Sequence, residues 1–422
     1  MVFGVLGGDS SILQIVLSFV MLGVFFLLFP KIILFQIMYK LKSAMDQLEI
    51  NAQEAEMTFL EEATDVSPSK VKDAVDSMKN MVVSPPSNLD PSGMFEKMEH
   101  VLDSSDDKIK EFVRSIKPES GSEERANNAM AFKGVYGAHQ IFVVMRHFKK
   151  LIEETKNYQL GGMIQMMLPV YKELSESQKD ATEAFVNEVP IGDTIGPMIS
   201  ARMMESEGEE IAEDIVYSKE EIDGGECIVV KSKGPGSRLG KYGNAVEKLV
   251  EEEEVAKILT VDAGMRYEGE ETGTVVDGSG VLMGGPGVEK GKIEEVATEN
   301  DVPLHGYIVK QSGPEASRPM HKKIWDAQEE VINNLKDEVR NTDGTVMIVG
   351  VGNTCGAGNH KESLKGLKKK LRPYWKEQEE EVTSYLGLMK AFPGMGIFTG
   401  MSGGSGYQET ENTFRLFQKV AR

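Results

Sequence analysis

The chain has 422 residues, of which 40% are hydrophobic and 27% are charged, and its formal net charge is −20. This length exceeds what one hydrophobic core usually supports, so we expect more than one structural unit. The balance of residue types excludes a wholly disordered chain and a polytopic membrane protein. The acidic charge argues against nucleic-acid binding, which depends on Lys and Arg neutralising phosphates.

An apolar run near the N-terminus predicts one membrane-spanning helix. Residues 12–29 form this run, and at about 1.5 Å of rise per residue they extend roughly 27 Å, close to the thickness of a bilayer core. The apolar character continues to Met38. We therefore predict an anchor at residues 12–38, after a short external N-terminus at residues 1–11. A cleaved signal peptide is the alternative, but no positively charged segment precedes the run.

The lysines near the anchor predict its orientation. Lys31, Lys40 and Lys42 lie within or just after the run, whereas Asp9 precedes it. Because positive residues tend to stay on the cytoplasmic side, we expect a single-pass protein of the cell membrane with its N-terminus outside. The lipid bilayer is then a partner, and the rest of the chain lies in the cytoplasm.

Residues 39–200 are predicted to form a helical region. A stretch with three prolines and a glycine, residues 83–93, predicts a linker within it. Before this linker, apolar residues recur at helical spacing, at Leu41, Met45, Leu48, Ala52, Ala55 and Phe59. This seam favours packing within the subunit, although a homo-oligomeric stalk would give the same pattern.

A second apolar cluster in this region is rich in methionine. Met163, Met166 and Met167 precede Leu168 and Pro169. Such a stripe is typical of core packing, and an adaptable binding surface is the alternative.

The remaining chain divides into an acidic connector at residues 201–217 and an α/β domain at residues 218–422. Short β-rich runs followed by glycines and then helical sequence indicate this fold class. The complete prediction is therefore an α + α/β protein with an N-terminal transmembrane helix, a helical middle and glycine-rich strand-to-helix loops.

Two of these loops are candidate sites for an anionic small molecule, because glycine lets backbone amides approach a ligand at a helix N-terminus. The candidate ligands of the first loop are Gly234, Gly236, Arg238, Gly240 and Lys241, and those of the second are Gly352, Asn353, Thr354, Gly356, Gly358 and Asn359. Neither loop has the spacing of a Walker A or dinucleotide fingerprint. Tight connections with solvated cations would explain the first loop equally well.

Three residues are candidates for catalysis. Asp262 follows an apolar strand at its carboxyl end, where open α/β sheets build their sites. His305 could act as a general acid or base, although a lone His is more often structural. Cys355 would be a nucleophile if the second loop lowered its pKa.

Carboxylates beside glycines suggest a metal site. Asp262, Glu268, Glu270 and Asp277 form an oxygen-ligand set suited to Mg²⁺ or Mn²⁺. A hairpin whose charges face water is the other interpretation.

The motifs SPPSNLDPSG, IGDTIGP, KGPGSRLGKYG, EGEETG and VGVGNTCGAGN, together with the anchor, resemble an archaeal family of uncharacterised membrane proteins that carries a domain of unknown function. The resemblance covers nearly the whole chain. It implies a membrane protein from an archaeal source, and it implies no activity or catalytic residues.

Two functions are compatible with these features. The first is a membrane-tethered protein whose α/β domain binds a phosphorylated or nucleotide-like ligand, with a divalent-metal-dependent hydrolase as its enzymatic form. The second is a non-enzymatic scaffold that self-associates or recruits partners through the helical region. A large separation between the two glycine loops, at residues 234–243 and 352–359, would favour the scaffold.

Overall fold

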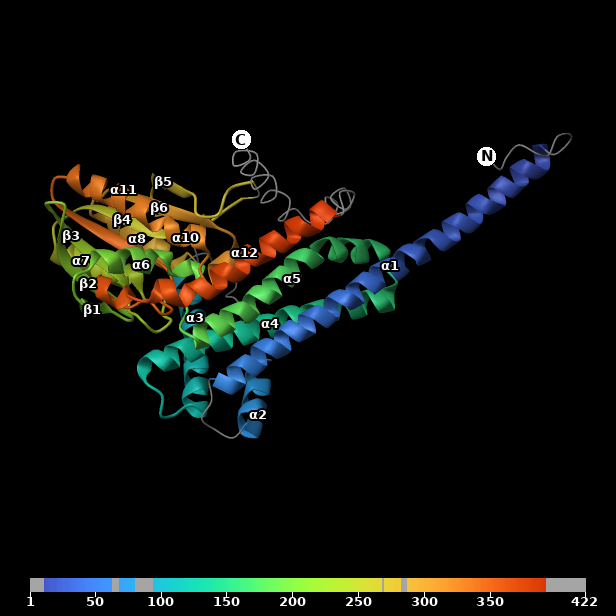
Figure 1. Ribbon diagram of the computed structural model, residues 1–422, viewed down its shortest axis with the longest axis horizontal. Coiled ribbons are helices and arrows are strands. Elements are labelled where there is room, and N and C mark those ends of the chain that lie inside the picture. Colours follow the sequence, from blue (N-terminus) through green and yellow to red (C-terminus); the bar gives the residue numbers. More distant parts are fainter. Residues whose placement is uncertain (1–10, 63–67, 80–93, 268, 282–286, 392–422) are drawn as a thin grey trace.

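The computed structural model describes residues 11–62, 68–79, 94–267, 269–281 and 287–391. The chain forms a long N-terminal helix, a bundle of further helices and a domain built on a mixed β-sheet (Figure 1). The predicted linker at residues 83–93 and the glycine-rich tail after Ala391 lie outside the described residues.

Helix α1 (Ser11–Glu62) has two parts with different surroundings. Its apolar first part is exposed and projects beyond the other helices (Figure 1). From Ile37 onward, one face is buried. The predicted seam from Leu41 to Phe59 supplies this face, so the prediction of packing within the subunit is confirmed.

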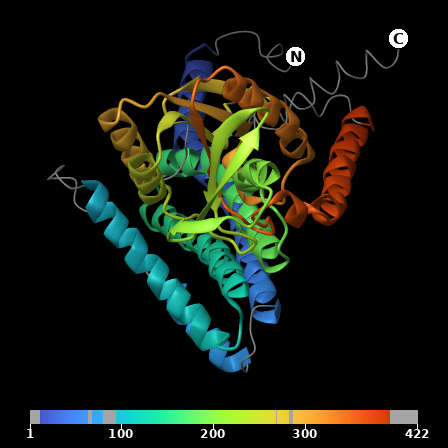
Figure 2. The same cartoon turned by 90° about the vertical axis from the view of Figure 1, so that its left-hand side faces the viewer.

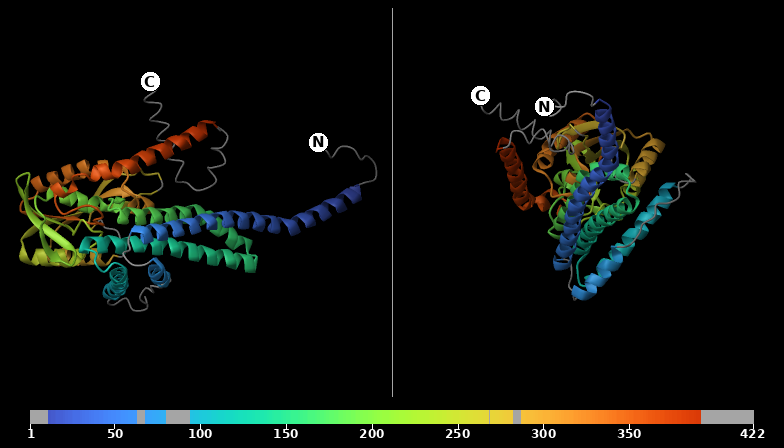
Figure 3. Two further views of the ribbon diagram at one scale, coloured as in Figure 1. Left: turned by 60° about the horizontal axis from the view of Figure 1, so that its bottom comes forward. Right: turned by 90° about the vertical axis from the view of Figure 1, so that its right-hand side faces the viewer.

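Among the described residues, the helical part continues with four helices. They are α2 (Pro68–Met78), α3 (Met94–Ile116), α4 (Ser122–Thr155) and α5 (Tyr158–Val186). The α4–α5 turn follows from its sequence, because Lys156 adopts a left-handed φ of 54° and the Asn157 side chain accepts a hydrogen bond from the Leu160 amide, which caps α5. The hairpin runs alongside α1 (Figure 3).

Aromatic packing joins α1, α3 and α4. The rings of Phe112 and Phe132 lie 4.6 Å apart between centroids, and Phe59 lies 5.6 Å from Phe132. All three side chains are buried. Fully burying an aromatic side chain contributes about 1.5–3 kcal/mol, so this cluster holds the carboxyl-terminal half of α3 on the bundle.

In the described part of the chain, the sheet has seven strands in the order β1-β2-β3-β7-β4-β6-β5. The strands are β1 (Glu209–Ala212), β2 (Ile215–Ile222), β3 (Gly225–Ser232), β4 (Val255–Met265), β5 (Val275–Ser279), β6 (Leu304–Gln311) and β7 (Thr345–Gly350). The four central strands are parallel, whereas β1, β2 and β5 are antiparallel to their neighbours. The carboxyl ends of β3, β7 and β4 therefore meet at one edge of the sheet.

Helices cover both faces of this sheet (Figure 2). One face packs against α7 (Tyr242–Glu252) and α8 (Val288–Glu299). The other packs against a layer that includes η1 (Gly192–Thr194), α6 (Ile195–Met203), α9 (Gly313–Ser317), α10 (Lys322–Asp326), α11 (Gln328–Arg340), η2 (Lys361–Leu364) and α12 (Leu367–Ala391). Two buried faces explain why the central strands read as continuous apolar runs.

Residues 201–217, which the sequence predicts as an acidic connector, contain the end of α6, all of β1 and the start of β2. Helix α6 lies directly on the strands, since an added Cβ at Gly196 would lie 2.1 Å from the Val351 carbonyl oxygen. The sheet domain thus begins before residue 218. The antiparallel pairing of β1 with β2 allows its acidic side chains to face water.

The methionine stripe is a second difference from the sequence interpretation. Met163 is 65% exposed, Met166 is 82% exposed and Met167 is 45% exposed, whereas Leu168 is buried. Core packing is therefore wrong for these three methionines. Helix α5 uses a different stripe, which includes Ile164 and Leu168, to contact α1.

Candidate functional site

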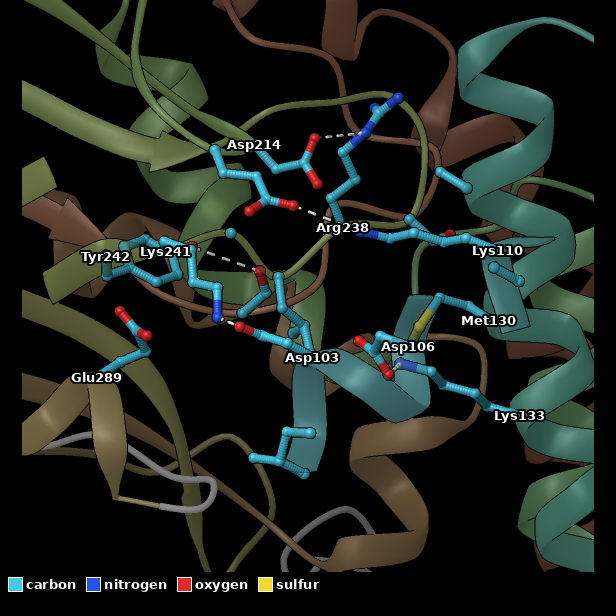
Figure 4. A pocket seen from close by; sticks show the side chains of 18 of the residues that line it. Asp103, Asp106, Lys110, Met130, Lys133, Asp214, Arg238, Lys241, Tyr242 and Glu289 are labelled. Carbon is cyan, nitrogen blue, oxygen red and sulfur yellow. Dashed lines mark hydrogen bonds and ion pairs between the residues drawn. The ribbon is translucent and has the colours of Figure 1, made fainter. Parts of the chain in front are cut away.

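A cavity of about 780 Å³ lies between the carboxyl edge of the sheet and helices α3 and α4. Its walls come from both halves of the chain (Figure 4). Residues 237–242 after β3, Asp262 and Ala263 of β4, and Val351 and Gly352 after β7 form its sheet side. This volume suits a small-molecule ligand.

The two predicted loops meet beside this cavity. The Thr354 hydroxyl donates to the Gly236 carbonyl oxygen at 2.6 Å, and the Arg238 amide donates to the Thr354 hydroxyl at 3.2 Å. The Asn359 side chain accepts a hydrogen bond from the Gly234 amide at 2.7 Å. The loops therefore form one unit, so the separation that would have favoured the scaffold interpretation is not observed.

Most amides of these loops already have partners within the protein. They donate from Gly236 to Glu123, from Ser237 to Asn127, from Asn353 to Asp193, from Thr354 to Arg238, from Cys355 to Asn353 and from Gly356 to Pro235. The N-terminus of α7 is also occupied, since the Gly243 amide donates to Glu289 at 2.7 Å. The bonded loop amides thus hold the two loops in place, and ligand contacts must come chiefly from side chains.

Arg238 is a structural ion-pair partner. Its guanidinium contacts Glu123 of α4 at 2.6 Å and Asp214 of the β1–β2 turn at 3.1 Å, while only 7% of its side chain is exposed. Although burial raises the pKa of Glu123, the hydrogen bonds from Arg238 and the Gly236 amide hold that pKa below its usual range. Arg238 therefore fastens the first loop to the helical part.

Lys241 ties α3 to the sheet domain. Its ammonium lies 3.2 Å from Glu99 and 2.6 Å from Asp103 (Figure 4). Lys292 of α8 contacts the same Glu99 at 2.9 Å. The hydrogen bond from Lys292, and then that from Lys241, lower the pKa of Glu99, while burial opposes the shift.

The floor of the cavity, which we define as Asp193, Tyr242, Asp262 and Gly352, carries two carboxylates and a phenol. Burial raises the pKa of Asp193, while the Asn353 amide opposes this by donating to its carboxylate at 2.8 Å. Burial also raises the pKa of Tyr242, and the negative charges of Asp262 and Asp193 add to that shift. The floor is therefore an acidic part of the cavity lining.

Two arginines that line the cavity, Arg114 and Arg125, come from its helical side, and we call them the rim. Arg114 of α3 is exposed and Arg125 of α4 is partly buried. Within the described ranges neither arginine forms an ion pair, whereas Lys110 and Lys133 on the same helices pair with Glu213 and Asp106. The rim thus offers positive charge that no described carboxylate neutralises.

Cys355 lies outside the cavity lining. It is fully buried, its thiol donates to the Ala184 carbonyl oxygen, and burial raises its pKa to about 12. A nucleophilic thiol needs the opposite shift. Gly234, Gly236, Asn353, Thr354, Gly356, Gly358 and Asn359 are likewise absent from the lining, while Arg238, Gly240, Lys241 and Gly352 belong to it.

His305 lies toward the other edge of the sheet. It stands near the start of β6 and pairs in register with Leu259, three positions before Asp262 on β4. At about 3.3 Å per residue this places it roughly 10 Å from the level of Asp262. Its imidazole lies 3.7 Å from Asp277.

The predicted metal ligands separate in the structure. Glu270 pairs with Lys310 at 3.1 Å, Asp277 faces His305, and Glu268 lies outside the described residues. In the described part of the chain, no group of three His, Cys, Asp or Glu side chains is arranged to hold a metal ion. Among the three members of the set that the structure describes, only Asp262 lines the cavity.

The sequence interpretation missed Asp193 on the floor and both rim arginines. Asp193 lies in IGDTIGP, which reads as a connector because of its glycines and proline. These glycines permit close packing, since a Cβ at Gly192 would lie 2.2 Å from the Glu315 carbonyl oxygen. An acidic residue between two closely packed glycines is the sequence signal that could have identified Asp193. No local signal marks Arg114 or Arg125, because their position depends on how α3 and α4 dock.

The fold and the cavity define a two-part protein, with a helical N-terminal part that begins in one long apolar helix and a mixed-sheet C-terminal domain. Residues 15–188 match the N-terminal domain of "Protein of unknown function (DUF1512)", and residues 191–358 match its C-terminal domain. The chain therefore belongs to the DUF1512 family. Comparisons with curated proteins and with solved structures give no match.

Proposed function

We propose that this protein is anchored in a membrane and binds a phosphorylated small molecule in the cavity between its helical part and its sheet domain. The observation that carries the proposal is the pairing of an acidic floor with a rim of two arginines in one cavity of about 780 Å³. A ligand that carries both an anionic group and a polar or metal-bound group fits this distribution of charge.

The rim is the evidence that the ligand carries an anionic group. A guanidinium presents a planar set of donors that matches the oxygens of a phosphate group. Arg114 and Arg125 come from two different helices that meet at the cavity. A phosphate between them would bridge α3 and α4.

The floor is the evidence for a divalent cation, which we propose arrives with the ligand. Mg²⁺ is usually held by one or two carboxylates together with substrate phosphates, and less often by an all-protein cage. Asp193 of η1 and Asp262 of β4 supply two carboxylates. Hydrolysis of a phosphate ester is the reaction that we propose for an enzymatic form, with Mg²⁺ or Mn²⁺ as the ion.

The exposed first part of α1 supports anchoring. Helix α1 is long and apolar enough to cross a bilayer, and the apolar window is wholly unburied. This is compatible with an anchor or a signal sequence. The lysines that follow the apolar run favour a single pass with the sheet domain in the cytoplasm. An archaeal source stays a prediction of the resemblance.

The test of ligand binding is a thermal-shift screen of the full chain in detergent. Nucleotides and sugar phosphates are added with and without Mg²⁺, and the unfolding temperature is read from Trp325 and Trp375 fluorescence. A ligand at about 100 times its Kd stabilises the folded state by about 2.7 kcal/mol. Binding should weaken about tenfold or more in Arg114→Gln/Arg125→Gln.

The matched control is Arg340→Gln, an arginine of α11 that pairs with Asp223 outside the cavity. It should leave the affinity unchanged. The absence of a shift with every phosphorylated compound, with and without Mg²⁺, would contradict the proposal. Release of inorganic phosphate from a ligand that does bind tests the hydrolase.

A further inference from the structure

The tip of the α4–α5 hairpin carries apolar side chains on two faces of α5. One face, which includes Ile164 and Leu168, is buried against α1 and α4. The other face carries Met163, Met166, Met167 and Val170, which we call the methionine stripe, and these side chains are 45–82% exposed. Contact with water along a whole stripe of large apolar residues is unfavourable, so this face needs a covering surface.

The position of the tip indicates what covers the stripe. The start of α5 packs on α1 at the end of its apolar run, since an added Cβ at Gly161 would lie 2.9 Å from the Ile37 side chain. Leu34 and Met38 of α1 belong to the same apolar cluster. The hairpin ends beside α1, and the exposed apolar part of α1 continues beyond it (Figures 1 and 3). If α1 spans a bilayer, the hairpin tip is therefore at the level where α1 leaves it.

The charge around the tip is complementary to an anionic surface. Residues 141–160 carry four basic side chains, Arg146, Lys149, Lys150 and Lys156, and two acidic ones, Glu153 and Glu154. This local excess of positive charge occurs in a chain of net charge −20. Each Lys or Arg close to an anionic lipid surface contributes about 1 kcal/mol of attraction.

We propose that the tip of the α4–α5 hairpin is a second membrane contact, in which the methionine stripe enters the boundary between headgroups and acyl chains and the neighbouring basic residues face anionic headgroups. The inference rests on the proposed anchoring by α1. With two contacts the helical bundle is fixed relative to the membrane plane, which a single spanning helix does not achieve.

Site-directed spin labelling tests this contact in the full chain. Cys227 and Cys355 are buried, and burial raises the pKa of each thiol to about 12, so neither competes for a thiol reagent. Met166→Cys is labelled, and the chain is reconstituted in vesicles of phosphatidylcholine and phosphatidylglycerol. Lipid-soluble oxygen and a water-soluble nickel chelate then report the immersion depth of the label.

Two further labels make the result decisive. Met57→Cys is the matched control, because Met57 is an exposed methionine of α1 about 30 Å along the helix from Ile37. Leu22→Cys reports the anchor itself. We expect oxygen to be favoured at positions 22 and 166 and the nickel chelate at position 57. Replacing phosphatidylglycerol by phosphatidylcholine should make the label at position 166 shallower.

Each other outcome overturns the inference in a distinguishable way. An immersed label at position 22 with a water-exposed label at position 166 leaves the anchor intact and contradicts the second contact. A water-exposed label at position 22 contradicts anchoring by α1, and it also contradicts the second contact, which rests on that anchoring. Spin–spin broadening at position 166, without oxygen preference, shows that a second copy of the chain covers the stripe instead.

Discussion

At the scale of single residues, Lys231 is the most unusual titratable group outside the cavity. Its side chain is fully buried at the end of β3 and donates to the Ser232 carbonyl oxygen at 2.7 Å and to Asn359 at 3.0 Å. Burial lowers its pKa from 10.5 to about 7, although Glu207 and Glu123 oppose the shift. At neutral pH the folded protein therefore holds this lysine partly uncharged.

This shift predicts a pH-dependent stability. Between about pH 7 and about pH 10 the unfolded chain binds the Lys231 proton while the folded chain releases it, so the free energy of unfolding rises with pH. The slope from this group is at most about 1.4 kcal/mol per pH unit. In Lys231→Met that part of the slope should disappear, so the stability of the variant relative to the native chain should fall as pH rises. Denaturant unfolding, followed by tryptophan fluorescence, measures the difference.

Lys336→Met is the control for Lys231→Met, since Lys336 is a surface lysine that pairs with Asp223 at 3.6 Å. Its removal should leave the dependence on pH in this range unchanged. Parallel pH curves for the native chain and Lys231→Met would show that Lys231 keeps its ordinary pKa in the folded protein.

At the scale of elements, helix α3 is held by different forces along its length. Its carboxyl-terminal half buries Ile109, Phe112 and Val113 against the bundle. Its amino-terminal half meets the sheet domain through the ion pairs of Glu99 and Asp103. Salt screens the ion pairs and leaves apolar burial intact or strengthens it.

The two halves of α3 should therefore respond differently to the loss of charge. In Lys241→Met/Lys292→Met, hydrogen exchange of residues 97–107 should accelerate about fivefold or more, whereas residues 109–116 should keep their protection. About 1 M salt should reproduce much of this effect in the native chain, because the Debye length is then about 3 Å. Mass spectrometry of peptic fragments measures both halves in one sample.

Acid should act on the same contact. The pKa of Glu99 is lowered from 4.5 in the folded protein, so its stabilising contribution is complete above that pH and is lost as the pH falls through the folded value.

Lys290→Met is the control for the hydrogen-exchange comparison with Lys241→Met/Lys292→Met, since Lys290 also lines the cavity but pairs with Glu294 on its own helix. If hydrogen exchange accelerated equally in the control, or equally in both halves of α3, ion pairs would not be what holds the amino-terminal half.

The elements were largely predictable from periodicity. The seam of α1 and the apolar runs of β3, β4 and β7 are strong local signals, because burial of one helix face or of both sheet faces imposes a repeat on the sequence. The methionine stripe shows the limit of this signal. On α5 both the buried and the exposed stripes are apolar, so spacing identifies a helix and leaves open which face the protein covers.

The candidate site was predictable only where it follows a strand. Asp262 and Gly352 stand after apolar runs, and the strand direction places them at one edge. The role of Arg238 was not predictable, since a cation in a glycine loop has the same local sequence whether it binds a ligand or a carboxylate. Glu123, which neutralises it, is more than a hundred positions away.

At the scale of the whole molecule, the cavity exists only because the two family domains of the chain pack against each other. Its floor comes from residues 191–358 and its rim from residues 15–188. If α1 spans a bilayer, the exposed apolar part of α1 that enters it and the sheet domain that borders the cavity lie at opposite ends of the molecule (Figure 1). The helical bundle then holds the cavity away from the membrane surface.

The anchor itself gives the last prediction. Leu22→Arg/Leu27→Arg places two guanidinium groups in the exposed apolar part of α1. Each Arg near the centre of a spanning helix costs about 2.5–3.5 kcal/mol, so the pair should move most of the chain out of the carbonate-resistant membrane fraction. Ile50→Arg/Met57→Arg is the control, because both residues are exposed apolar positions of the same helix beyond the run.

Mass spectrometry of the purified native chain separates an anchor from a cleaved signal sequence. An anchor keeps the apolar run in the mature protein, and cleavage removes it. Retention of the double arginine variant in the membrane fraction, or a mature chain that begins after the run, would contradict anchoring by α1. Because the hairpin tip lies beside Ile37, loss of the anchor should also release the methionine stripe from the bilayer.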